Sequence, residues 1–226
     1  YCGRQGGSVA STRDRILDAA LKLFNEQGTA AVSTNHIAAE INISPGNLYY
    51  HFRNKEDIIR SIFKLYEQHL ESGFQPYEGK KVDVDLLIGY FDALFYTLWQ
   101  FRFMYANLVI ILSRDEVLNK EYTVIHEQVL KRATSILSQL KQDGVLVIDD
   151  EEITPLADTI RMVACFWISN ELTHSETTRI TKTSLYEGLL RVLMIFKAYA
   201  SESAKPTFIR LEQHYKALAK AEQEED

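Results

Sequence analysis

The chain has 226 residues, of which 46% are hydrophobic and 25% charged, a composition typical of a globular protein with a substantial core. Its 10 glycines and 4 prolines are too few for a turn-dense β-sandwich or a disordered chain, and they favour helices. The net charge of −6 gives no sign of a nucleic-acid-binding protein, but the charge is local, since Glu40 is the single acidic residue between Gln27 and Lys55.

The first helix is predicted to begin after Ser11, because Asp14 follows it at the spacing of a capping box. Apolar residues recur with helical period from there until Gly28, which supplies a stop. Either Ser33 or Thr34 caps a second, shorter helix. These signals predict two helices in the first forty or so residues.

Two further helices are predicted to follow directly. Asn42 ends the second helix, because asparagine tolerates a left-handed backbone. Ser44 caps the third helix, with Pro45 in the favoured first position, and Asn54 with Asp57 caps a longer fourth helix. Two very short helices separated by a three-residue turn indicate a helix-turn-helix inside a small bundle.

A break at residues 73–79 separates this bundle from a larger helical region. The segment 143–150 is predicted to be a loop or a short strand, and no strand-rich segment competes with the helical pattern, so the expected fold class is all-α. The helices predicted in the larger region span approximately residues 82–100, 102–112, 116–142, 154–174, 178–200 and 206–222.

The segment from Ser33 to Asp57, with the string LYYHF at residues 48–52 followed by Lys55 and an acidic residue, resembles the signature of the TetR/AcrR family. The resemblance is good from Ser11 to about Ile62. It implies a helix-turn-helix, three-helix DNA-binding domain at residues 8–54 and a larger helical domain at residues 55–226 that binds an effector and dimerises. The implied function is ligand-responsive transcription regulation, with repression as the commoner outcome.

A recognition helix enters the major groove N-terminus first, so its leading residues meet base edges. The compact residues that open the third helix allow close approach, and Asn47 offers an amide to an adenine edge. The following tyrosines and histidine present donors to phosphates, and Lys55 adds its charge at the start of the fourth helix. The resulting DNA-binding candidates are Thr34, Asn35, Pro45, Gly46, Asn47, Tyr49, Tyr50, His51 and Lys55.

Purely structural roles compete for several neighbouring residues. Leu48 and Phe52 are expected in the core, as is one of the tyrosine rings, while His36 is better explained as a surface or capping group and Arg53 as a solvated one. Many relatives have Ala-Gly before the turn, where this chain has Ile-Asn at 41–42. That departure leaves the operator sequence open.

The larger region is rich in aromatic residues at helical spacing, which are more often core than ligand contacts. The family resemblance implies an effector cavity here, and polar residues in apolar surroundings need a partner that a ligand can supply. We therefore expect a largely apolar, lipid-like or aromatic small molecule held by one or two hydrogen bonds. The ligand-binding candidates are Phe95, Trp99, Phe103, Tyr122, His126, Arg161, Phe166, Trp167 and Asn170.

The helix predicted at 178–200 has two apolar stripes, one containing Leu185 and Leu189 and the other Leu190 and Met194. A helix with two apolar sides must bury both. One side is expected to face its own domain and the other the same helix of a second subunit. A homodimer with twofold symmetry then presents two recognition helices to a palindromic operator of double-stranded DNA.

The remaining features exclude other classes of protein. Cys2 and Cys165 form no disulfide framework, and Cys165 is expected to be a buried thiol. Neither a signal peptide nor an apolar run of roughly 18 residues is present, so we expect a cytoplasmic protein without a membrane partner. Residues Tyr1 to Gly7 are left out of the fold prediction.

Two other functions compete with ligand-responsive regulation. A DNA-bound structural or cell-division protein would use the same fold with a filled, ligand-indifferent core. An enzyme is not supported, because we find no Gly-rich phosphate loop, no closely spaced His/Cys metal set and no nucleophile–base pair. We therefore predict no catalytic residue, no metal site and no cofactor.

Overall fold

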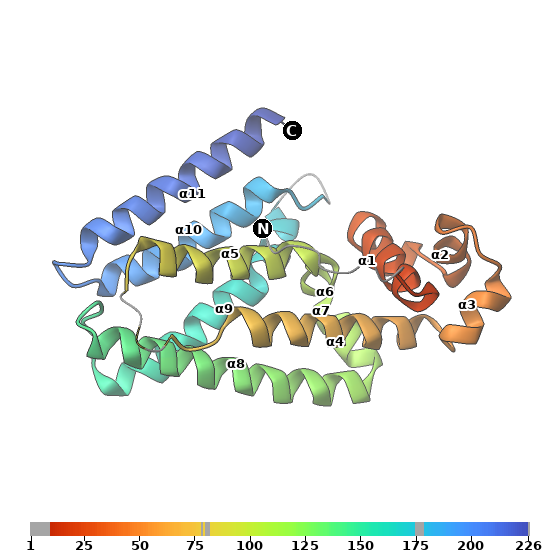
Figure 1. The fold of residues 1–226 in the computed structure, drawn as a ribbon, viewed down its shortest axis with the longest axis horizontal. Helices are drawn as coiled ribbons and strands as arrows, with labels where there is room; N and C mark the ends of the chain where they lie inside the picture. Colours follow the sequence, from red (N-terminus) through yellow and green to blue (C-terminus); the bar gives the residue numbers. More distant parts are fainter. Residues whose placement is uncertain (1–9, 78, 80–81, 175–178, 226) are drawn as a thin grey trace. The chain divides into compact units, whose positions relative to one another are not determined.

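The computed structural model describes residues 10–77, 79, 82–174 and 179–225. Within these ranges the regular structure is helical, and one isolated β-bridge pairs Leu146 with Ala200 (Figure 1). The predicted all-α fold is therefore confirmed. The segment Tyr1 to Gly7 lies outside the described residues. The helices are α1 (Thr12–Ala31), α2 (Thr34–Glu40), α3 (Pro45–His51), α4 (Lys55–Gly73), α5 (Val84–Gln100), α6 (Arg102–Ala106), α7 (Leu108–Arg114), α8 (Glu116–Gln142), α9 (Asp150–His174), α10 (Lys182–Tyr199) and α11 (Lys205–Glu225).

The chain folds into two compact units that divide between Leu65 and Tyr66. The first unit contains α1, α2, α3 and the start of α4, and the second contains the end of α4 and all later helices. Helix α4 therefore contributes residues to both units. No helix in the described part of the chain is long and apolar enough to cross a membrane.

The capping signals at the start of the chain are confirmed. Ser11 caps α1, its hydroxyl accepting from the Asp14 amide at 3.1 Å while the Asp14 carboxylate accepts from the Ser11 amide. Gly28 interrupts the helical geometry with φ of 77°, a left-handed value that costs glycine little. Ser33, rather than Thr34, caps α2.

The turn between α2 and α3 also follows the sequence signals. Asn42 has a φ of 55°, and among the described residues no other residue except glycine has a positive φ. The Ser44 hydroxyl accepts from the Asn47 amide at 3.2 Å, and Pro45 is the first residue of α3. Because both ends of the turn are fixed by local hydrogen bonds, the direction in which α3 leaves the turn is well defined.

A small apolar core holds the first unit together. One face each of α1, α2, α3 and α4 is buried there, as the helical periodicity of their apolar residues requires. Complete burial of each large side chain contributes about 1.5–3 kcal/mol. The fully buried residues of this core include Ile16, Ala20, Phe24, Ile37, Leu48, Phe52, Ile58 and Ile62.

In the second unit, α10 contacts α5, α9 and α11, while α8 contacts α7 and α9. Figure 1 shows α11, in dark blue, lying beside α10. The Tyr215 hydroxyl of α11 donates to the Asp92 carboxylate of α5 at 2.7 Å. The C-terminal helix is therefore an integral layer of this unit.

Three predicted boundaries in the second unit were wrong. The helix expected at 102–112 is split at Asn107, which has non-helical φ and ψ and whose side-chain amide donates to the Phe103 carbonyl at 3.4 Å. Helix α9 begins at Asp150 rather than at the expected residue 154. The carboxylates of Asp150, Glu151 and Glu152 lie in its first turn, where they interact favourably with the positive end of the helix dipole. Helix α10 begins at Lys182, where the Thr181 hydroxyl caps it, rather than at 178, which lies outside the described residues.

Candidate DNA-binding and effector-binding sites

Helices α2 and α3 with the turn between them form a helix-turn-helix whose second helix has one buried and one exposed side. The side chain of Leu48, in α3, is fully buried, and so is that of Phe52, the residue that follows α3, as predicted. Tyr50, in contrast, is 86% exposed and Tyr49 is 51% exposed, so the expectation that one of these two rings lies in the core is wrong. Aromatic side chains this exposed contribute little to the core, so they are available to a partner.

The predicted DNA-binding residues lie on these two helices and at the start of α4. Asn35 of α2 and the residues that open α3 are exposed, while Thr34 and His51 are half-buried. The hydroxyls of Thr34 and Tyr49 lie 3.0 Å apart and share a hydrogen bond, which links the N-terminus of α2 to α3. The Tyr50 and His51 rings pack edge to face, with centroids 5.2 Å apart.

Asn47 occupies the first turn of α3 with an exposed side chain. Its backbone amide is taken by the Ser44 cap at 3.2 Å. The side-chain amide is therefore presented at the N-terminal end of the exposed helix, the end that reads base edges in helix-turn-helix proteins. Pro45 and Gly46 are exposed beside it and add little bulk.

Lys55 is more constrained than the sequence indicated. Its ammonium group donates to the carbonyl oxygens of Thr29 at 2.7 Å and Val32 at 3.2 Å, so it ties the start of α4 to the end of α1. An ammonium group has three donors, and these contacts account for two of them. Any phosphate contact by Lys55 is therefore combined with a structural role that sequence analysis missed.

Two arginines of α1 also have structural roles that the sequence did not reveal. The Arg13 guanidinium lies 4.9 Å from the centre of the Phe52 ring and donates to the Ser61 hydroxyl. The Arg15 guanidinium donates to the Ile41 carbonyl at 3.0 Å, where α2 ends.

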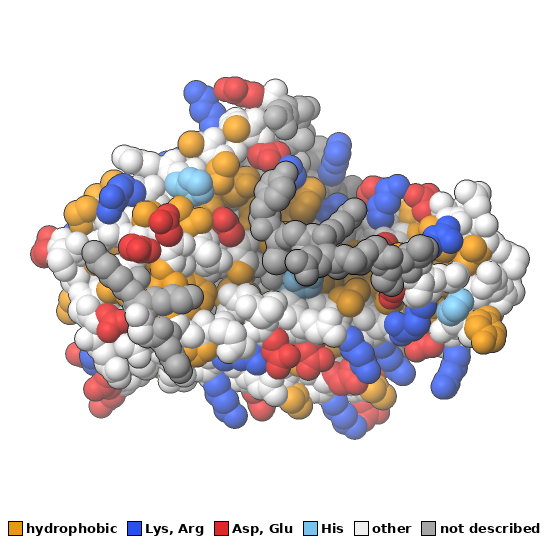
Figure 2. Space-filling view, in the orientation of Figure 1, with side chains coloured by type: hydrophobic (Ala, Val, Ile, Leu, Met, Phe, Trp, Pro, Cys, Tyr) orange, Lys and Arg blue, Asp and Glu red, His pale blue; other side chains and the backbone are white. Residues whose placement is uncertain are grey.

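On the face drawn in Figure 2, basic and acidic side chains are interspersed, so charge alone does not mark a DNA-binding surface on that face.

The aromatic residues predicted to bind an effector lie in separate places in the second unit. Phe95 stacks on Tyr186, with ring centroids 4.2 Å apart. Trp99 lies under the Arg102 guanidinium, 4.0 Å from the centre of its ring system. Phe103 is buried.

Tyr122 and His126 belong to a buried polar cluster. Their rings stack at 3.9 Å, and the His126 Nε2 atom lies 3.0 Å from the Tyr66 hydroxyl, which accepts in turn from Tyr105 at 3.1 Å. The His126 Nδ1 atom is buried with no hydrogen-bond partner among the described residues. Burial, with a smaller contribution from the nearby Arg161 charge, lowers the pKa of His126 to about 4, so its ring is neutral at pH 7.

Cys165 lies beside this cluster as the buried thiol that the sequence predicted. Burial raises the pKa of Cys165 to about 11, which keeps the thiol protonated at neutral pH. Arg161 donates to the Asp158 carboxylate of the same helix at 2.6 Å. The polar groups predicted to need a ligand are thus partly satisfied within the fold.

Phe166, Trp167 and Asn170 line a shallow hollow between α9 and α10. Met162 and Met194 line the same hollow and are 51% and 58% exposed. The indole nitrogen of Trp167 donates to the Ser184 carbonyl at 2.7 Å. The hollow is therefore an apolar surface shared by two helices.

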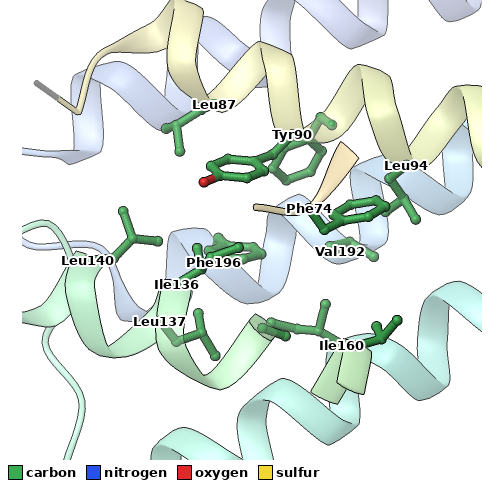
Figure 3. A pocket seen from close by; sticks show the side chains of 13 residues that line it. Phe74, Leu87, Tyr90, Leu94, Ile136, Leu137, Leu140, Ile160, Val192 and Phe196 are labelled. Carbon is green, nitrogen blue, oxygen red and sulfur yellow. The ribbon is translucent and has the colours of Figure 1, made fainter. Parts of the chain in front are cut away.

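A separate, partly open cavity of about 120 Å³ lies within the second unit (Figure 3). None of the nine predicted ligand-binding residues lines it. Its α5 residues have i, i+3, i+4 and i+7 spacing, a signal present in the sequence but identical to that of an ordinary core face. The lining residues are Phe74, Leu87, Tyr90, Phe91, Leu94, Val129, Ala133, Ile136, Leu137, Leu140, Ile160, Val192 and Phe196.

The described residues contain no group of three or more histidine, cysteine or acidic side chains placed to hold a metal ion. A capped helix-turn-helix with an exposed second helix is the arrangement that DNA-binding proteins of this kind present to the major groove.

Comparison with known proteins identifies the family. A family model described as "Bacterial regulatory proteins, tetR family" matches residues 16–62, and one described as "Bacterial transcriptional repressor" matches residues 65–208. The chain belongs to the TetR family of DNA-binding transcriptional regulators, as its resemblance indicated, and the named members of this family are regulators rather than enzymes.

Individual relatives agree with this assignment. A crystal structure of a TetR-family regulator from Marinobacter aquaeolei VT8 is 30% identical, with a TM-score of 0.82 over 91% of this chain and 99% of that one. The regulator AcrR of Shigella flexneri is 36% identical over 30% of this chain and 32% of its own length. The negative transcriptional regulator IcaR of Staphylococcus epidermidis is 28% identical over 53% of this chain and 68% of its own. The chain therefore spans about a third of the AcrR relative that it matches.

Proposed function

We propose that this protein is a cytoplasmic, homodimeric repressor that binds a palindromic operator and releases it when an apolar small molecule binds. In this proposal residues 8–54 bind DNA, and residues 55–226 bind the effector and dimerise. The outward presentation of α3 carries the proposal, since Asn47, Tyr49 and Tyr50 are exposed together on a helix whose opposite side is buried. This is the arrangement that major-groove reading requires.

The apolar hollow between α9 and α10 supports dimerisation. Met162, Phe166 and Met194 are large hydrophobic residues with substantial exposure, and they lie on neighbouring helices. Exposed apolar patches of this kind mark interfaces, and a twofold axis buries the same patch on both subunits. Sedimentation at micromolar concentration tests this, and a monomer would contradict it.

Control by a ligand is proposed to act through α4, which runs from Lys55 in the first unit to Gly73 in the second. An effector that binds one position of this helix better than another shifts the population of dimers whose reading helices fit the operator. A coupling of roughly 1–3 kcal/mol would weaken operator binding about 5- to 150-fold. From the expected effector set, Tyr122 and His126 are proposed as hydrogen-bonding groups at a place separate from the cavity of Figure 3, because the His126 Nδ1 atom is buried without a described partner.

The alternative function of a DNA-bound structural protein has less support. An internal cavity is unexpected for a DNA-bound structural protein with a filled core, whereas an effector-responsive regulator requires one. Selection of bound sequences from random double-stranded DNA, followed by titration of the selected site, tests the proposal directly. Failure to bind any duplex at low salt would refute it.

The Asn47→Ala substitution is expected to relax base preference at one position in each half-site. A bidentate amide contact to adenine contributes about 1–3 kcal/mol of discrimination, and alanine lacks both polar atoms. The Ser44 cap is retained because it uses the backbone amide of residue 47. Fluorescence anisotropy on operators that carry single base changes measures the effect, and equal losses on every sequence would exclude a reading role.

The Lys55→Met substitution is expected to reduce the salt dependence of DNA binding. Each lost phosphate contact lowers the slope of log affinity against log salt concentration by about 0.9. The control is Lys22→Met, which removes a lysine of the same unit whose ammonium lies 2.7 Å from Glu40. An unchanged slope with a lower melting temperature would mean that Lys55 only ties α4 to the Thr29 and Val32 carbonyls.

A further inference from the structure

The start of α3 has little support from its own side chains. None of residues 42–47 is buried. The buried side chains of Leu48 and Phe52 lie further along the chain. The Tyr49 hydroxyl, 3.0 Å from that of Thr34, also belongs to this later part of the helix. Because a helix anchored in its second half can still pivot, the direction of its first residues depends on the turn that precedes them.

The local hydrogen bonds of that turn leave one carbonyl without a partner. The Asn42 amide donates to the Ala39 carbonyl at 3.2 Å, and Asn42 has a left-handed backbone with a φ of 55°. The Ile43 amide donates to the Ala38 carbonyl at 3.0 Å. These are the two bonds of a Schellman motif, which ends a helix through a left-handed residue. The motif does not use the carbonyl of Ile41, the residue at which α2 ends.

Arg15 supplies the missing partner from α1, which packs against α2 (Figure 1). Its guanidinium Nη2 donates to the Ile41 carbonyl oxygen at 3.0 Å. Within the described part of the chain, no other side chain from outside the helix-turn-helix hydrogen-bonds to residues 41–47. The guanidinium forms no ion pair with a described carboxylate, although Asp18 lies one helical turn further along α1. The carbonyl is therefore the hydrogen-bond partner of Arg15.

A cation suits this position because α2 ends here. Carbonyl oxygens at a helix C-terminus carry partial negative charge, and α2 has no basic residue in its own last turn. Helix α1 also supplies Lys22, whose ammonium lies 2.7 Å from the Glu40 carboxylate. Lys22 thus holds a side chain that can rotate, whereas Arg15 holds the backbone itself. The Arg15 contact, unlike the Lys22 contact, restrains the peptide plane from which the chain turns towards α3.

We infer that Arg15 is a positioning residue: by holding the Ile41 carbonyl it fixes the direction in which α3 leaves the turn, and so the pose in which Asn47 meets base edges. The consequence for operator recognition rests on the proposed function, because it requires that α3 reads DNA. The restraint on the turn is a property of the free protein, so the two can fail separately.

Loss of the contact lowers the fraction of reading helices that point in the fitting direction, and the apparent affinity falls by that fraction. We expect Arg15→Met to cost about threefold for each reading helix and about tenfold for a palindromic operator that takes two of them. Binding to an unrelated duplex is expected to remain unchanged, because contacts to phosphates carry no sequence information and do not need the reading pose.

The first measurement is hydrogen exchange at the Ile43 amide in the whole chain without DNA. This amide bonds within the turn, so its exchange reports how often the turn opens. Arg15→Met is expected to raise the exchange rate about threefold. Lys22→Met, which removes the other cationic contact to the end of α2, is the control and is expected to leave the rate unchanged. An unchanged rate in Arg15→Met would overturn the inference.

The second measurement is the affinity for a selected operator and for an unrelated duplex over a range of salt concentrations. A loss on the operator alone, with the salt dependence of the wild type, supports a positioning role. A loss on both duplexes, with a slope of log affinity against log salt lower by about 0.9 or more, would show that Arg15 contacts phosphate and would overturn the inference. Faster exchange at Ile43 with unchanged operator affinity would also overturn it, because the turn would then not set the reading pose.

A second variant and the wild type keep the outcomes distinct. Arg15→Gln, whose shorter side chain ends before the position of the guanidinium, replaces Arg15→Met if that variant does not fold, and the same results are expected. If the wild type selects no operator, the proposed function fails, and the exchange rate at Ile43 still decides whether Arg15 positions the turn.

Discussion

Replacing Gly188 with alanine is expected to lower the free energy of unfolding by about 1–3 kcal/mol. Gly188 lies within α10, where helix propensity alone predicts that alanine would stabilise by about 1 kcal/mol. The packing opposes this gain, because a Cβ atom on Gly188 would lie 2.5 Å from Cδ1 of the Trp167 ring. The ring cannot easily retreat while its nitrogen donates to the Ser184 carbonyl at 2.7 Å.

The matched control is Gly89→Ala in α5. A Cβ atom on Gly89 meets no other atom within 4 Å, so this substitution is expected to stabilise by about 1 kcal/mol. Urea unfolding of both variants at one protein concentration gives the comparison. The double variant Gly188→Ala/Trp167→Leu should recover part of the loss. Stabilisation by Gly188→Ala alone would show that α9 and α10 do not pack this closely.

Lowering the pH from 7 to 4 is expected to reduce stability by up to about 3 kcal/mol through His126 alone. Burial lowers the pKa of His126 to about 4, whereas an unfolded histidine titrates near 6.5. Between these values the unfolded chain binds a proton that the folded chain does not. The contribution is therefore fully present above pH 6.5 and is lost as the pH falls toward 4.

His126→Gln is expected to flatten this part of the pH profile, because glutamine does not titrate and can still reach the Tyr66 hydroxyl that pairs with Nε2. Thermal unfolding between pH 4 and 7 measures the difference between variant and wild type, which cancels the titration of other groups. His174→Gln, a change at an exposed histidine of α9, serves as the control and should keep the wild-type profile. Parallel profiles for wild type and His126→Gln would contradict a buried neutral ring.

The N-terminal part of the fold was predictable because its signals are local. A hydroxyl cap such as Ser11 or Ser44 bonds within three residues, and the left-handed backbone of Asn42 follows from its own side chain. These interactions depend on nearby sequence alone. The family resemblance rests on the same segment, and the family model that matches residues 16–62 confirms it.

The placement of the cationic groups was less predictable. The sequence predicts a role for Lys55 from its charge alone, yet its ammonium group also donates to the carbonyl oxygens of Thr29 and Val32, some 25 residues earlier in the chain. A lysine on an exposed helix start and a lysine folded back on a neighbouring helix have the same local sequence. Only the approach of α1 to α4 distinguishes them.

Sequence by itself determined the all-α class and the turn between α2 and α3, because helical periodicity and capping are read within a few residues. It also determined the family, because the resemblance rests on a short segment that contains LYYHF at residues 48–52. Tertiary structure decided which apolar faces close around empty space. Leu87, Phe91 and Leu94 have the spacing of a core face, and so do the rings of Phe95 and Trp99 that were expected to bind the effector. A cavity is a difference between the volume that several helices enclose and the volume that their side chains fill, and no single segment encodes that difference.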